Sequence, residues 1–591
     1  MLEQNKITPN CVIRIPASTT YSTAGEKLMG RQSANESFLR AWLQYSGHEN
    51  FCCLARSRDE AQTFARIGKE LVPDDRRVYR WLSHQNIHKV SEVGTLYLPG
   101  PQVADMAWIR RRNPHCKEND FSLVGMTHTT CELTIQDALA DMLSAPVHPW
   151  DAQICPSQSV HRMVEQLLQD EASWLRERFG SACQITMPQL PIIPIGLHCD
   201  DFDLPATEHE QLRSEWRKRW SVADDEVVAL YMGRLDLRTK ANLFPMFDAL
   251  ERAASKIKSK HVRLVLVLAG WFSNEWNEKT IREGLPKACP SLRVIIEDGR
   301  PKDARRGVWH GADLFTSLVD NIQETFGITP IEAMATGLPV VVSDYDGYRE
   351  SIRDGIDGFH VRTWQPRAGA AIDWLDQFSD NTMGYGQYVA KVSALIGIDV
   401  EQAADIYARL ALDPQLRKKL GASGRQRARQ VYDWPQLMSS YRQLFEELAV
   451  IRKGATVAPW WDRAPSQTPA WGARYPRKSD PFHSFAHYPT ATIDANTRLR
   501  FQTVDGLTQN SPLEMLHMHL ERPVYDNLVS GKTLTLDFLE HIIAQLAHSN
   551  SSVSVATLLA SAAREEDETA RLYLERQIGW LIKTGLVVVS N

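Results

Sequence analysis

Two glutamates lie eight residues apart in the part of this chain whose residue types are best suited to chemistry. Glu324 and Glu332 flank a Phe-Gly pair, and Thr329 followed by Pro330 is typical of the cap and the first residue of a helix. The free amides and the positive dipole end at such a helix N-terminus favour an anion. The segment therefore predicts carboxylates that lie beside a bound anion.

Glu332 has a purely structural alternative. Thr329 and Glu332 have the spacing of a capping box, in which the glutamate carboxylate accepts a hydrogen bond from the amide of the cap residue. Glu324 lies in the preceding loop, where a carboxylate repels a phosphate unless it binds something attached to that phosphate, such as sugar hydroxyls. Both interpretations of Glu332 stay open on spacing alone, and Glu324 is the stronger candidate.

Further candidates follow predicted strands. Gly233, Arg234 and Lys240 come after the apolar run Glu226–Met232. The two basic side chains could neutralise a diphosphate through charge-assisted hydrogen bonds, although a solvated pair is the ordinary alternative. His128 also follows a predicted strand, where a single histidine is more often structural.

Two series of alternating strands and helices must position these residues. Apolar runs typical of parallel strands with helices on both faces occur in each half of the chain. The predicted strands are 12–15, 94–98, 121–126 and 152–156 in the first half, and 226–232, 263–270, 293–297, 314–317 and 339–343 in the second. Ligands of such sheets bind at the carboxyl ends of the strands, where the candidates fall.

We divide the chain into four parts. Residues 1–205 and 206–450 are the two predicted sheet domains, with an irregular insertion at about 364–397 and a closing helix over 431–448 in the second. Residues 451–509 include a stretch rich in proline and tryptophan, which we interpret as an extended strap. Residues 510–591 form a small, mainly α module. Its three predicted helices (536–547, 555–563 and 570–584) and final strand (585–589) suggest a winged helix.

The spacing Glu324-x7-Glu332, within E-x-F-G-x-x-x-x-E-A-M-A-x-G-x-P-V-V-x-S, resembles the signature of family 4 of the retaining glycosyltransferases. Other stretches are similar to the same family, most strongly within 225–362 and more diffusely over 10–450. They are Gly233 to Lys240, Pro194-Ile-Gly196 with Asp200 and Phe202, Asp346-Gly-Tyr348 to Gly358, Tyr432-Asp-Trp434, Met29-Gly-Arg-Gln32, Thr127-His128-Thr129 and Cys155-Pro-Ser157. The resemblance implies the α/β GT-B fold, in which two Rossmann-like domains face each other across a cleft.

The resemblance also implies roles for single residues. Arg234 and Lys240 would neutralise the leaving diphosphate, which a metal ion does in other transferases. Glu324 would accept hydrogen bonds from the donor sugar, and Glu332 from the nucleotide ribose. His128 would lie near the anomeric carbon. The expected donor-binding residues are Gly30, Gly233, Arg234, Lys240, Glu324, Thr325, Phe326, Gly327, Ile328 and Glu332.

The chain departs from the family pattern at three points. Asp320 opens a D-N-I-Q stretch where proline and serine are commoner, and Thr325 replaces a glycine. Lys240 follows Arg234 by six residues, where five is more common. These departures put the donor preference in doubt more than the activity.

Composition excludes several classes of function. The 591 residues carry a net charge of −5, so neither nucleic acid nor a membrane surface is an expected partner. The longest apolar run is far shorter than the roughly 20 residues of a membrane span, and a polar N-terminus argues against a signal peptide. Nine scattered cysteines fit free thiols in a reducing cytoplasm. We expect a cytoplasmic enzyme without cofactor or metal, since His483 and His487 have no third ligand nearby.

The C-terminal module bears on the acceptor. Residues 515–591 hold 6 Lys/Arg against 9 Asp/Glu, an acidic balance that favours a protein or peptide partner over DNA. The alternative is a role in stabilising the enzyme or in self-association. The nucleotide base, the sugar and the acceptor, whether protein, glycan or lipid, stay open.

Two rival functions remain. A nucleotide-sugar epimerase or a phosphorylase could use the same architecture, although no pyridoxal lysine is recognisable. A non-catalytic binding protein is the other rival, against which the four charged residues Arg234, Lys240, Glu324 and Glu332 argue.

Overall fold

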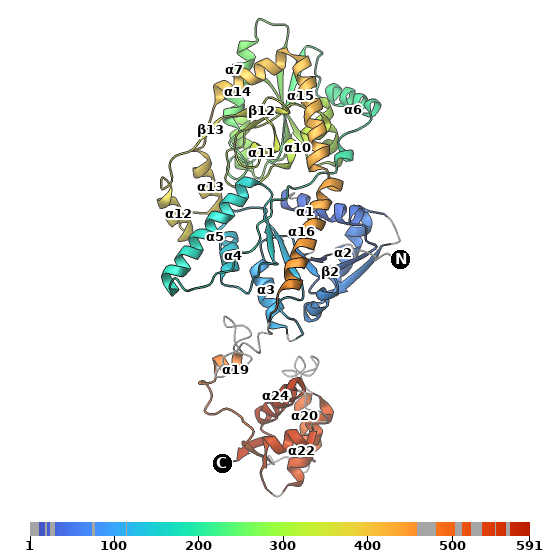
Figure 1. Ribbon diagram of the computed structural model, residues 1–591, viewed down its shortest axis with the longest axis vertical. Helices are drawn as coiled ribbons and strands as arrows, with labels where there is room; N and C mark the ends of the chain where they lie inside the picture. Colours follow the sequence, from blue (N-terminus) through green and yellow to red (C-terminus); the bar gives the residue numbers. More distant parts are fainter. Residues whose placement is uncertain are drawn as a thin grey trace. The chain divides into compact units, whose positions relative to one another are not determined.

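The computed structural model describes residues 11–17, 20–23, 30–73, 77–113, 115–457, 480–502, 511–521, 535–549, 551–562 and 568–590. The chain divides into two compact units, Met1–Pro476 and Arg477–Asn591, and each is described by itself (Figure 1). Residues 458–479 and 503–509 of the predicted strap lie outside the described residues. No described helix is long and apolar enough to cross a membrane. All nine cysteines are free thiols.

The first domain is a six-stranded parallel sheet in the order β3-β2-β1-β4-β5-β6. Its strands are β1 (Val12–Arg14), β2 (Asn50–Leu54), β3 (Val78–Leu82), β4 (Thr95–Leu98), β5 (Ser122–Met126) and β6 (Ala152–Ile154). Its helices are α1 (Gly30–Tyr45), α2 (Arg58–Leu71), η1 (His84–Glu92), α3 (Val103–Arg112), α4 (Leu133–Ala140), η2 (Asp141–Leu143) and α5 (Gln158–Phe179). The sequence analysis missed β2 and β3. β3 is an edge strand with largely exposed side chains, so it lacks the apolar run of a central strand.

The second domain repeats this plan, with the strand order β12-β11-β10-β7-β8-β9. Its strands are β7 (Glu226–Met232), β8 (Arg263–Gly270), β9 (Arg293–Asp298), β10 (Leu314–Ser317), β11 (Val340–Ser343) and β12 (Gly358–Val361). Its helices are η3 (Cys199–Asp201), α6 (Ala206–Arg219), α7 (Phe244–Lys256), α8 (Glu275–Ala288), α9 (Lys302–Gly311), α10 (Ile328–Thr336), α11 (Tyr348–Ser351), α14 (Val400–Leu412), α15 (Pro414–Arg427) and η4 (Ala428–Tyr432). All five predicted strands are confirmed, and two Rossmann-like sheets give the GT-B fold.

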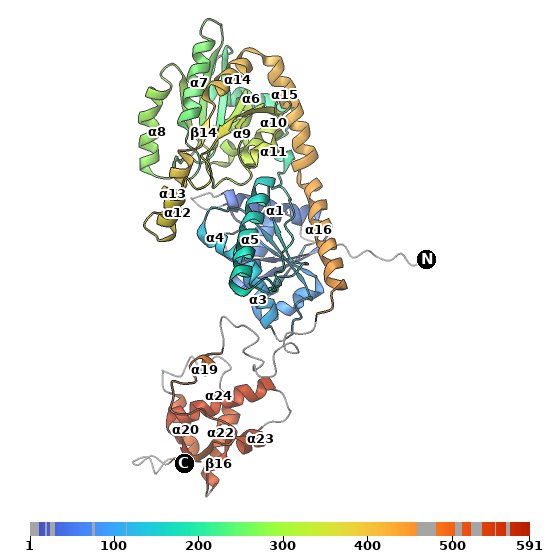
Figure 2. The same cartoon turned by 60° about the vertical axis from the view of Figure 1, so that its left-hand side comes forward.

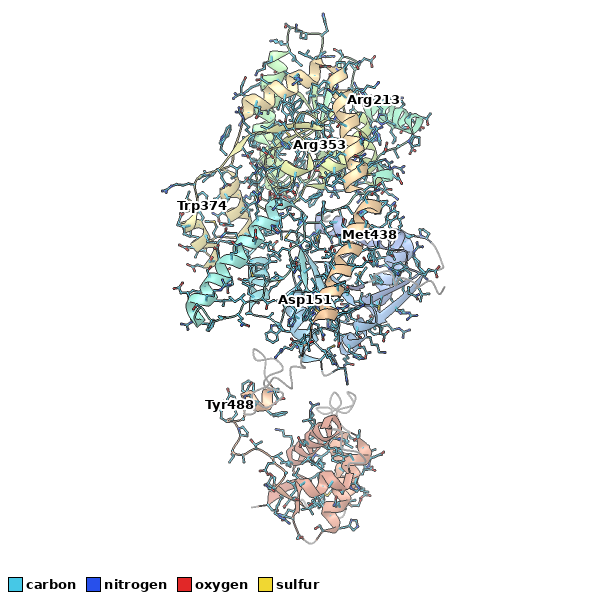
Figure 3. The ribbon with its side chains drawn as sticks, in the orientation of Figure 1. Asp151, Arg213, Arg353, Trp374, Met438 and Tyr488 are labelled. Carbon is cyan, nitrogen blue, oxygen red and sulfur yellow. The ribbon has the colours of Figure 1, made fainter. Side chains whose placement is uncertain are left out.

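The closing helix α16 (Trp434–Gly454) does not pack where the sequence analysis placed it. It lies along the first domain in both views (Figures 1 and 2), although its residues were assigned to the domain 206–450. Its apolar face joins the core around Phe38 and Trp42 of α1, and Met438 of this face is labelled in Figure 3. Trp434 covers Gly196, where an added Cβ would lie 2.4 Å from the indole. The helix therefore ties the interdomain turn to the first sheet.

The predicted irregular insertion is in fact ordered. It forms α12 (Ile372–Ser379) and α13 (Tyr385–Ser393), closed by an antiparallel pair of strands, β13 (Thr363–Trp364) and β14 (Gly397–Ile398). Its sequence lacks the apolar periodicity of a buried helix because much of α12 is exposed.

The C-terminal unit is a small domain with its own core. β15 (Arg498–Phe501) pairs antiparallel with β16 (Val553–Ser554) and with β17 (Val587–Ser590). The described helices are α19 (Pro481–Ser484), α20 (Pro512–Leu520), α22 (Leu536–His548), α23 (Val555–Ala562) and α24 (Glu568–Thr584). The three predicted helices and the final strand are present, whereas β15 and α20 were not predicted.

Candidate functional site

An ion pair joins two of the predicted site residues at the carboxyl edge of the second sheet. Lys240 Nζ donates to Glu324 Oε2 at 2.5 Å, across a sequence separation of 84 residues. Both side chains are mostly buried. Burial alone would raise the pKa of Glu324, but Lys240 and the amides of Thr325 and Phe326 outweigh burial and hold the pKa below its usual value. Glu324 is therefore an ionised acceptor, and the Phe326 amide faces it rather than an empty anion site.

Arg234 lies on the same turn as Lys240. Its Nη2 donates to the carbonyl of Thr239 at 3.1 Å, and its Nη1 lies 3.5 Å from Asp236 Oδ2. Asp236 in turn accepts hydrogen bonds from the amides of Arg238 and Thr239, which shapes the turn. The arginine is thus held by one carbonyl and a distant carboxylate, which leaves donor capacity for a further anion.

Gly233 opens this turn directly after β7. Its amide donates to Ala269 at the end of β8. At Gly270 an added Cβ would lie 1.9 Å from the Gly233 carbonyl, so the two strand ends touch backbone to backbone. This close packing brings the basic turn to the edge of the sheet.

Helix α10 begins two residues earlier than predicted. Gly327 is its cap, with φ 78°, and Ile328 is its first residue, so Thr329 is inside the helix. The predicted capping box of Thr329 and Glu332 is wrong. The early start is tertiary in origin, because a Cβ on Gly327 would lie 1.7 Å from the ring of Tyr348 and only glycine fits the left-handed conformation there.

Glu332 is therefore free of the structural role that competed with a functional one. In the described part of the chain its carboxylate makes no hydrogen bond or ion pair. Burial raises the pKa of Glu332 to about 7, and Arg305 opposes the rise. Glu332 lies about one helical turn after the start of α10. A hydroxyl that donates a hydrogen bond to its carboxylate would favour the ionised form.

The residues that depart from the family pattern hold the two site loops together. Asn321 Nδ2 donates to the Arg238 carbonyl at 2.8 Å, and the Asn242 amide donates to Asp320 Oδ1 at 3.1 Å. Ser393 of α13 donates to the same carboxylate oxygen of Asp320 at 2.7 Å. The departures thus connect the basic turn, the glutamate loop and the insertion.

Thr325, which replaces the family glycine, joins the two domains. Its Oγ1 donates to the His128 carbonyl at 3.1 Å, and its own carbonyl accepts from Ser157 Oγ at 2.8 Å. The carboxyl ends of β5 and β6 therefore meet the glutamate loop. The structure brings the His128 backbone to the loop that carries Glu324.

His128 itself is a neutral ring. Burial, followed by the charge of Arg31, lowers its pKa to about 4. Its Nε2 lies 3.1 Å from Asn35 Oδ1, which is an acceptor, so the ring proton is on Nε2. Gly30 is the first residue of α1 rather than part of a loop, and nothing lies within 4 Å of a Cβ added there.

Asp346 is a site residue that the sequence analysis named only as part of a similar stretch. It has a left-handed φ of 48°, unusual for a residue other than glycine. Its Oδ2 is buried without a hydrogen-bond partner. Burial and the charge of Glu324 raise the pKa of Asp346 to about 8. The signal that could have found it is an aspartate directly before Gly347 in a turn after a buried strand.

The insertion reaches the site through Tyr385. Its hydroxyl donates to Gln323 Oε1 at 2.8 Å and lies 3.2 Å from Cys131 Sγ, so it bridges the second and the first domain. Figures 1 and 2 place α12 and α13 beside the first domain. A hollow of about 570 Å³ separates Arg238 of the basic turn from α13.

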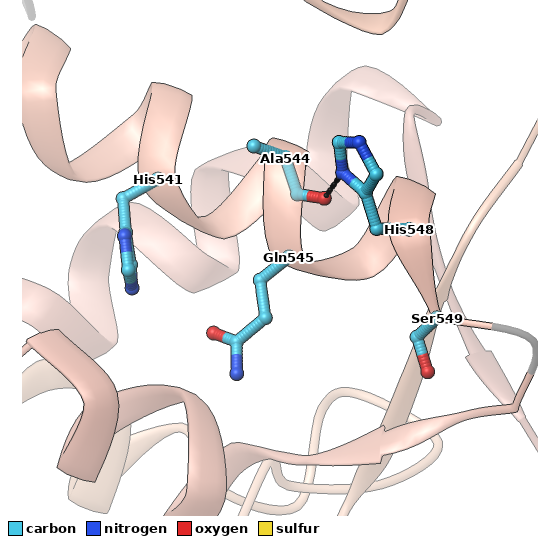
Figure 4. A pocket seen from close by; sticks show the side chains of 5 residues that line it. All are labelled: His541, Ala544, Gln545, His548 and Ser549. Atoms are coloured by element: carbon cyan, nitrogen blue, oxygen red, sulfur yellow. Dashed lines mark hydrogen bonds between the residues drawn. The ribbon is translucent and has the colours of Figure 1, made fainter.

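The C-terminal unit has a separate hollow of about 450 Å³ along the end of α22 (Figure 4). His541, Gln545 and His548 line it, and His548 Nδ1 donates to the Ala544 carbonyl at 2.6 Å. This shallow hollow has no cluster of groups with chemistry comparable to the edge of the second sheet.

Comparisons with known proteins find similarity to glycosyltransferases. Residues 213–382 match the family Glycosyl transferases group 1. An uncharacterized glycosyltransferase of Methanocaldococcus jannaschii is 27% identical over 219 residues, which are 36% of this chain and 51% of the relative. A lipopolysaccharide 1,2-N-acetylglucosaminetransferase of Salmonella typhimurium is 26% identical over 256 residues, 43% and 55% of the two chains. The match spans about half the length of these curated relatives.

A solved structure also aligns with this chain. Anabaena HepE in complex with UDP has a TM-score of 0.47 and 13% identity, and the alignment covers 74% of this chain and 100% of that chain. All the site residues of the second domain fall inside the segment that matches the family. Residues 213–382 thus match the family Glycosyl transferases group 1, within a chain of GT-B fold.

Proposed function

We propose that this chain is a retaining, metal-independent glycosyltransferase of family 4, which moves a sugar from a nucleotide diphosphate sugar to an acceptor. The observation that carries the proposal is the Lys240–Glu324 pair beside Arg234 at the carboxyl edge of the second sheet. Two cations suit a diphosphate, and an ionised carboxylate suits the hydroxyls of the sugar attached to it.

The ligand-free ion pair gives each partner a role in binding. When a donor binds, the Lys240 ammonium turns from Glu324 to the diphosphate, and the carboxylate accepts hydrogen bonds from sugar hydroxyls. Arg234 adds its free guanidinium hydrogens to the same phosphates. Positive charge on the leaving group lowers the barrier because negative charge develops there in the transition state.

The transfer step then needs no nucleophile from the enzyme. The bond between the anomeric carbon and the diphosphate oxygen breaks, and the acceptor hydroxyl oxygen forms the new bond on the same face. The acceptor proton passes to the leaving diphosphate. The neutral ring of His128 and the Ser157–Thr325 contact line this part of the site from the first domain, so they position the reacting groups without taking a charge.

A screen of UDP-, GDP-, ADP- and dTDP-sugars tests the proposal. One of them should bind, and it should be hydrolysed slowly when no acceptor is present, with the same rate after chelation of divalent metals. Retention is checked by the anomeric configuration of the first product. Absence of both binding and hydrolysis for all four would contradict the proposal, and formation of an epimerised donor would support the epimerase alternative.

The C-terminal unit supports a hypothesis about the acceptor. Its order α22, β16, α23, α24 and β17 suits a winged-helix module, and its acidic balance favours a protein or peptide partner. Deletion of residues 477–591 should leave donor hydrolysis intact and impair transfer to the acceptor. Loss of donor hydrolysis would instead support a structural role for the unit.

A further inference from the structure

A buried arginine at the carboxyl edge of the first sheet has two nitrogens without a hydrogen-bond partner among the described residues. Arg14 is the last residue of β1 and is 9% exposed. Its Nε and Nη1 are buried and make no hydrogen bond. Among the described residues no carboxylate forms an ion pair with it. A buried charge is strongly disfavoured unless it is paired, so this arrangement requires an explanation.

Another buried arginine of the same domain shows what a structural role looks like. The two terminal nitrogens of Arg110 donate to both carboxylate oxygens of Asp151 and to the carbonyls of Phe121 and Pro146. Asp151 is labelled in Figure 3. Both terminal nitrogens of Arg110 and its charge are therefore satisfied by the fold and only its Nε is not, whereas Arg14 has no ion pair and its Nη1 is unpartnered as well.

Two further basic groups lie at the neighbouring strand ends. Arg56 follows β2, which is next to β1 in the sheet, and His84 follows β3, which lies on the far side of β2. Arg56 is exposed and His84 is half-buried, so they are accessible from solvent. Their charges reach Arg14: burial lowers its pKa, and Arg56 lowers it further. For His84, burial lowers the pKa first, followed by Arg14 and Arg56.

Two carboxylates near the cluster, Asp105 and Glu60, raise the pKa of Arg14 and offset part of its charge, but neither forms an ion pair with it among the described residues. Asp105 in the first turn of α3 is exposed and forms no ion pair with Arg14. Glu60 accepts a hydrogen bond from the Arg56 amide just before the cap residue Ser57 of α2, so one of its carboxylate oxygens is already used by the backbone. Tyr21 donates to the Arg14 carbonyl rather than interacting with the guanidinium. The buried Nε and Nη1 of Arg14 still have no hydrogen-bond partner at the base of the cluster.

This position suits a ligand of the first domain. Arg14 and His128 end strands β1 and β5, which are separated only by β4. Adjacent strands are about 4.8 Å apart, so the two strand ends are roughly 10 Å apart along the same edge. His128 touches the glutamate loop where the sugar would be delivered. An acceptor could therefore lie along this edge with one end at each residue.

We propose that Arg14, Arg56 and His84 form an oxyanion site that holds a phosphate or carboxylate group of the acceptor. The guanidinium fork of Arg14 binds either oxyanion with two parallel hydrogen bonds. The assignment to the acceptor rests on the function proposed above, whereas the site itself does not. The acceptor then carries its anionic group about 10 Å from the hydroxyl that receives the sugar.

Calorimetric titration of the full-length protein with inorganic phosphate tests the site. The wild type should bind phosphate in two places, here and at Arg234. Arg14→Met should weaken one of them at least tenfold and leave the other, and Arg234→Ala should do the reverse. Arg66→Met is the matched control, since Arg66 is exposed on α2 and pairs with Glu70. It should bind phosphate as the wild type does.

Thermal unfolding separates a binding role from a structural one. Methionine fills a similar volume without a charge, so Arg14→Met should melt at or above the wild-type temperature when no anion is present. A lower melting temperature with unchanged phosphate binding would overturn the proposal. If Arg14→Met does not fold, the variant Arg56→Met is measured instead, because Arg56 is exposed. Phosphate binding that is at least threefold weaker supports the site, and unchanged phosphate binding refutes it.

The titrations also distinguish this proposal from the proposed function. Loss of phosphate binding in Arg14→Met but not in Arg234→Ala would sustain the oxyanion site and count against the donor site, and the opposite result would do the reverse. Parallel titrations with acetate and with glycerol 3-phosphate identify the anion. Stronger binding of acetate indicates a carboxylate on the acceptor, stronger binding of the phosphate ester indicates a phosphate, and binding of none of the three anions at Arg14 overturns the proposal.

Discussion

The carboxyl edges of the two sheets differ in how their charges are satisfied. At the second edge, Lys240 and Glu324 neutralise each other, and Arg234 is held by a carbonyl and a nearby carboxylate. At the first edge, Arg14 has two buried nitrogens without partners and His128 is a neutral ring. The same fold therefore presents an ion-paired lysine and glutamate on one side and a buried arginine with unpartnered nitrogens on the other.

The difference shows two ways of preparing a binding site. The second edge is preorganised, because its charges are already placed by internal pairs and a ligand only exchanges partners with them. The first edge lacks counter-charges, so the folded protein tolerates an unfavourable group that a ligand would satisfy. Substitutions at the second edge should damage binding and transfer, whereas loss of the unpaired charge at the first should stabilise the ligand-free protein.

The largest effect is expected for Arg234→Ala. Removal of a positive group that faces the leaving diphosphate should lower kcat/KM for transfer by about 10²–10³-fold and should also weaken binding of the free nucleotide diphosphate. Steady-state kinetics and calorimetry measure the two effects. Arg238→Ala is the control, because the Arg238 guanidinium lies 4.3 Å from the centre of the Trp276 ring, outside the predicted donor contacts. Equal losses of kcat/KM and of nucleotide binding in both variants would show that Arg234 has no specific role at the diphosphate.

Glu324→Gln separates the sugar contact from the phosphate contact. The amide keeps the shape but loses the charge, so kcat for transfer should fall about 10²-fold. Binding of the free nucleotide diphosphate should stay the same or become tighter, because Lys240 is released from its ion pair. Calorimetry with the free nucleotide decides. A large loss of nucleotide affinity would show that the Lys240–Glu324 ion pair is needed for binding the phosphates as well.

Glu332 should make donor binding depend on pH. Its pKa of about 7 means that the ribose-accepting, ionised form disappears as the pH falls. Donor affinity should be about tenfold weaker at pH 6 than at pH 8, and Glu332→Gln should show much less of this change. Calorimetric titrations with a nucleotide diphosphate sugar measure it, since its diphosphate does not titrate in this range. Identical pH profiles for both proteins would refute a ribose contact through ionised Glu332.

The same group has a consequence for stability, with a definite sign. The folded pKa of Glu332 is raised from its ordinary 4.5, so the folded state binds the proton more tightly than the unfolded chain. The free energy of unfolding therefore decreases from about pH 4.5 to about pH 7 and is level above that. Glu332→Gln should remove this decrease. Denaturant unfolding at a series of pH values checks it.

The smallest effect is expected at Asp346. Asp346→Gly removes a buried carboxylate oxygen without a partner and suits the left-handed φ of 48°, so it should stabilise the ligand-free protein by about 1 kcal/mol. Gly347→Ala is the opposite case, because its Cβ would lie 2.7 Å from the Cα of Phe326. That variant should be less stable than the wild type. Denaturant unfolding measures the free energy of unfolding of both variants. A lower free energy of unfolding in Asp346→Gly than in the wild type would indicate a structural role for the carboxylate.

The buried parallel strands were the most predictable part of the fold. β7, β8, β10 and β11 are continuous apolar runs because both of their faces are covered, and their bounds agree with the prediction to within one residue. β3 was missed because it is an exposed edge strand. The closing helix was recognised, but amphipathic periodicity says only that a helix has an apolar face, not which domain covers it.

The residue types and their spacing determined which side chains could bind a nucleotide sugar: Arg234, Lys240, Glu324 and Glu332 were all identified from the sequence. Only the tertiary structure decided how these groups are partnered. It paired Lys240 with Glu324 and, by starting α10 at Ile328, removed the cap role of Glu332. It also buried two nitrogens of Arg14 without a hydrogen-bond partner among the described residues. The physical reason is that ionisation and hydrogen bonding depend on burial and on neighbours far apart in the chain, which local spacing does not encode.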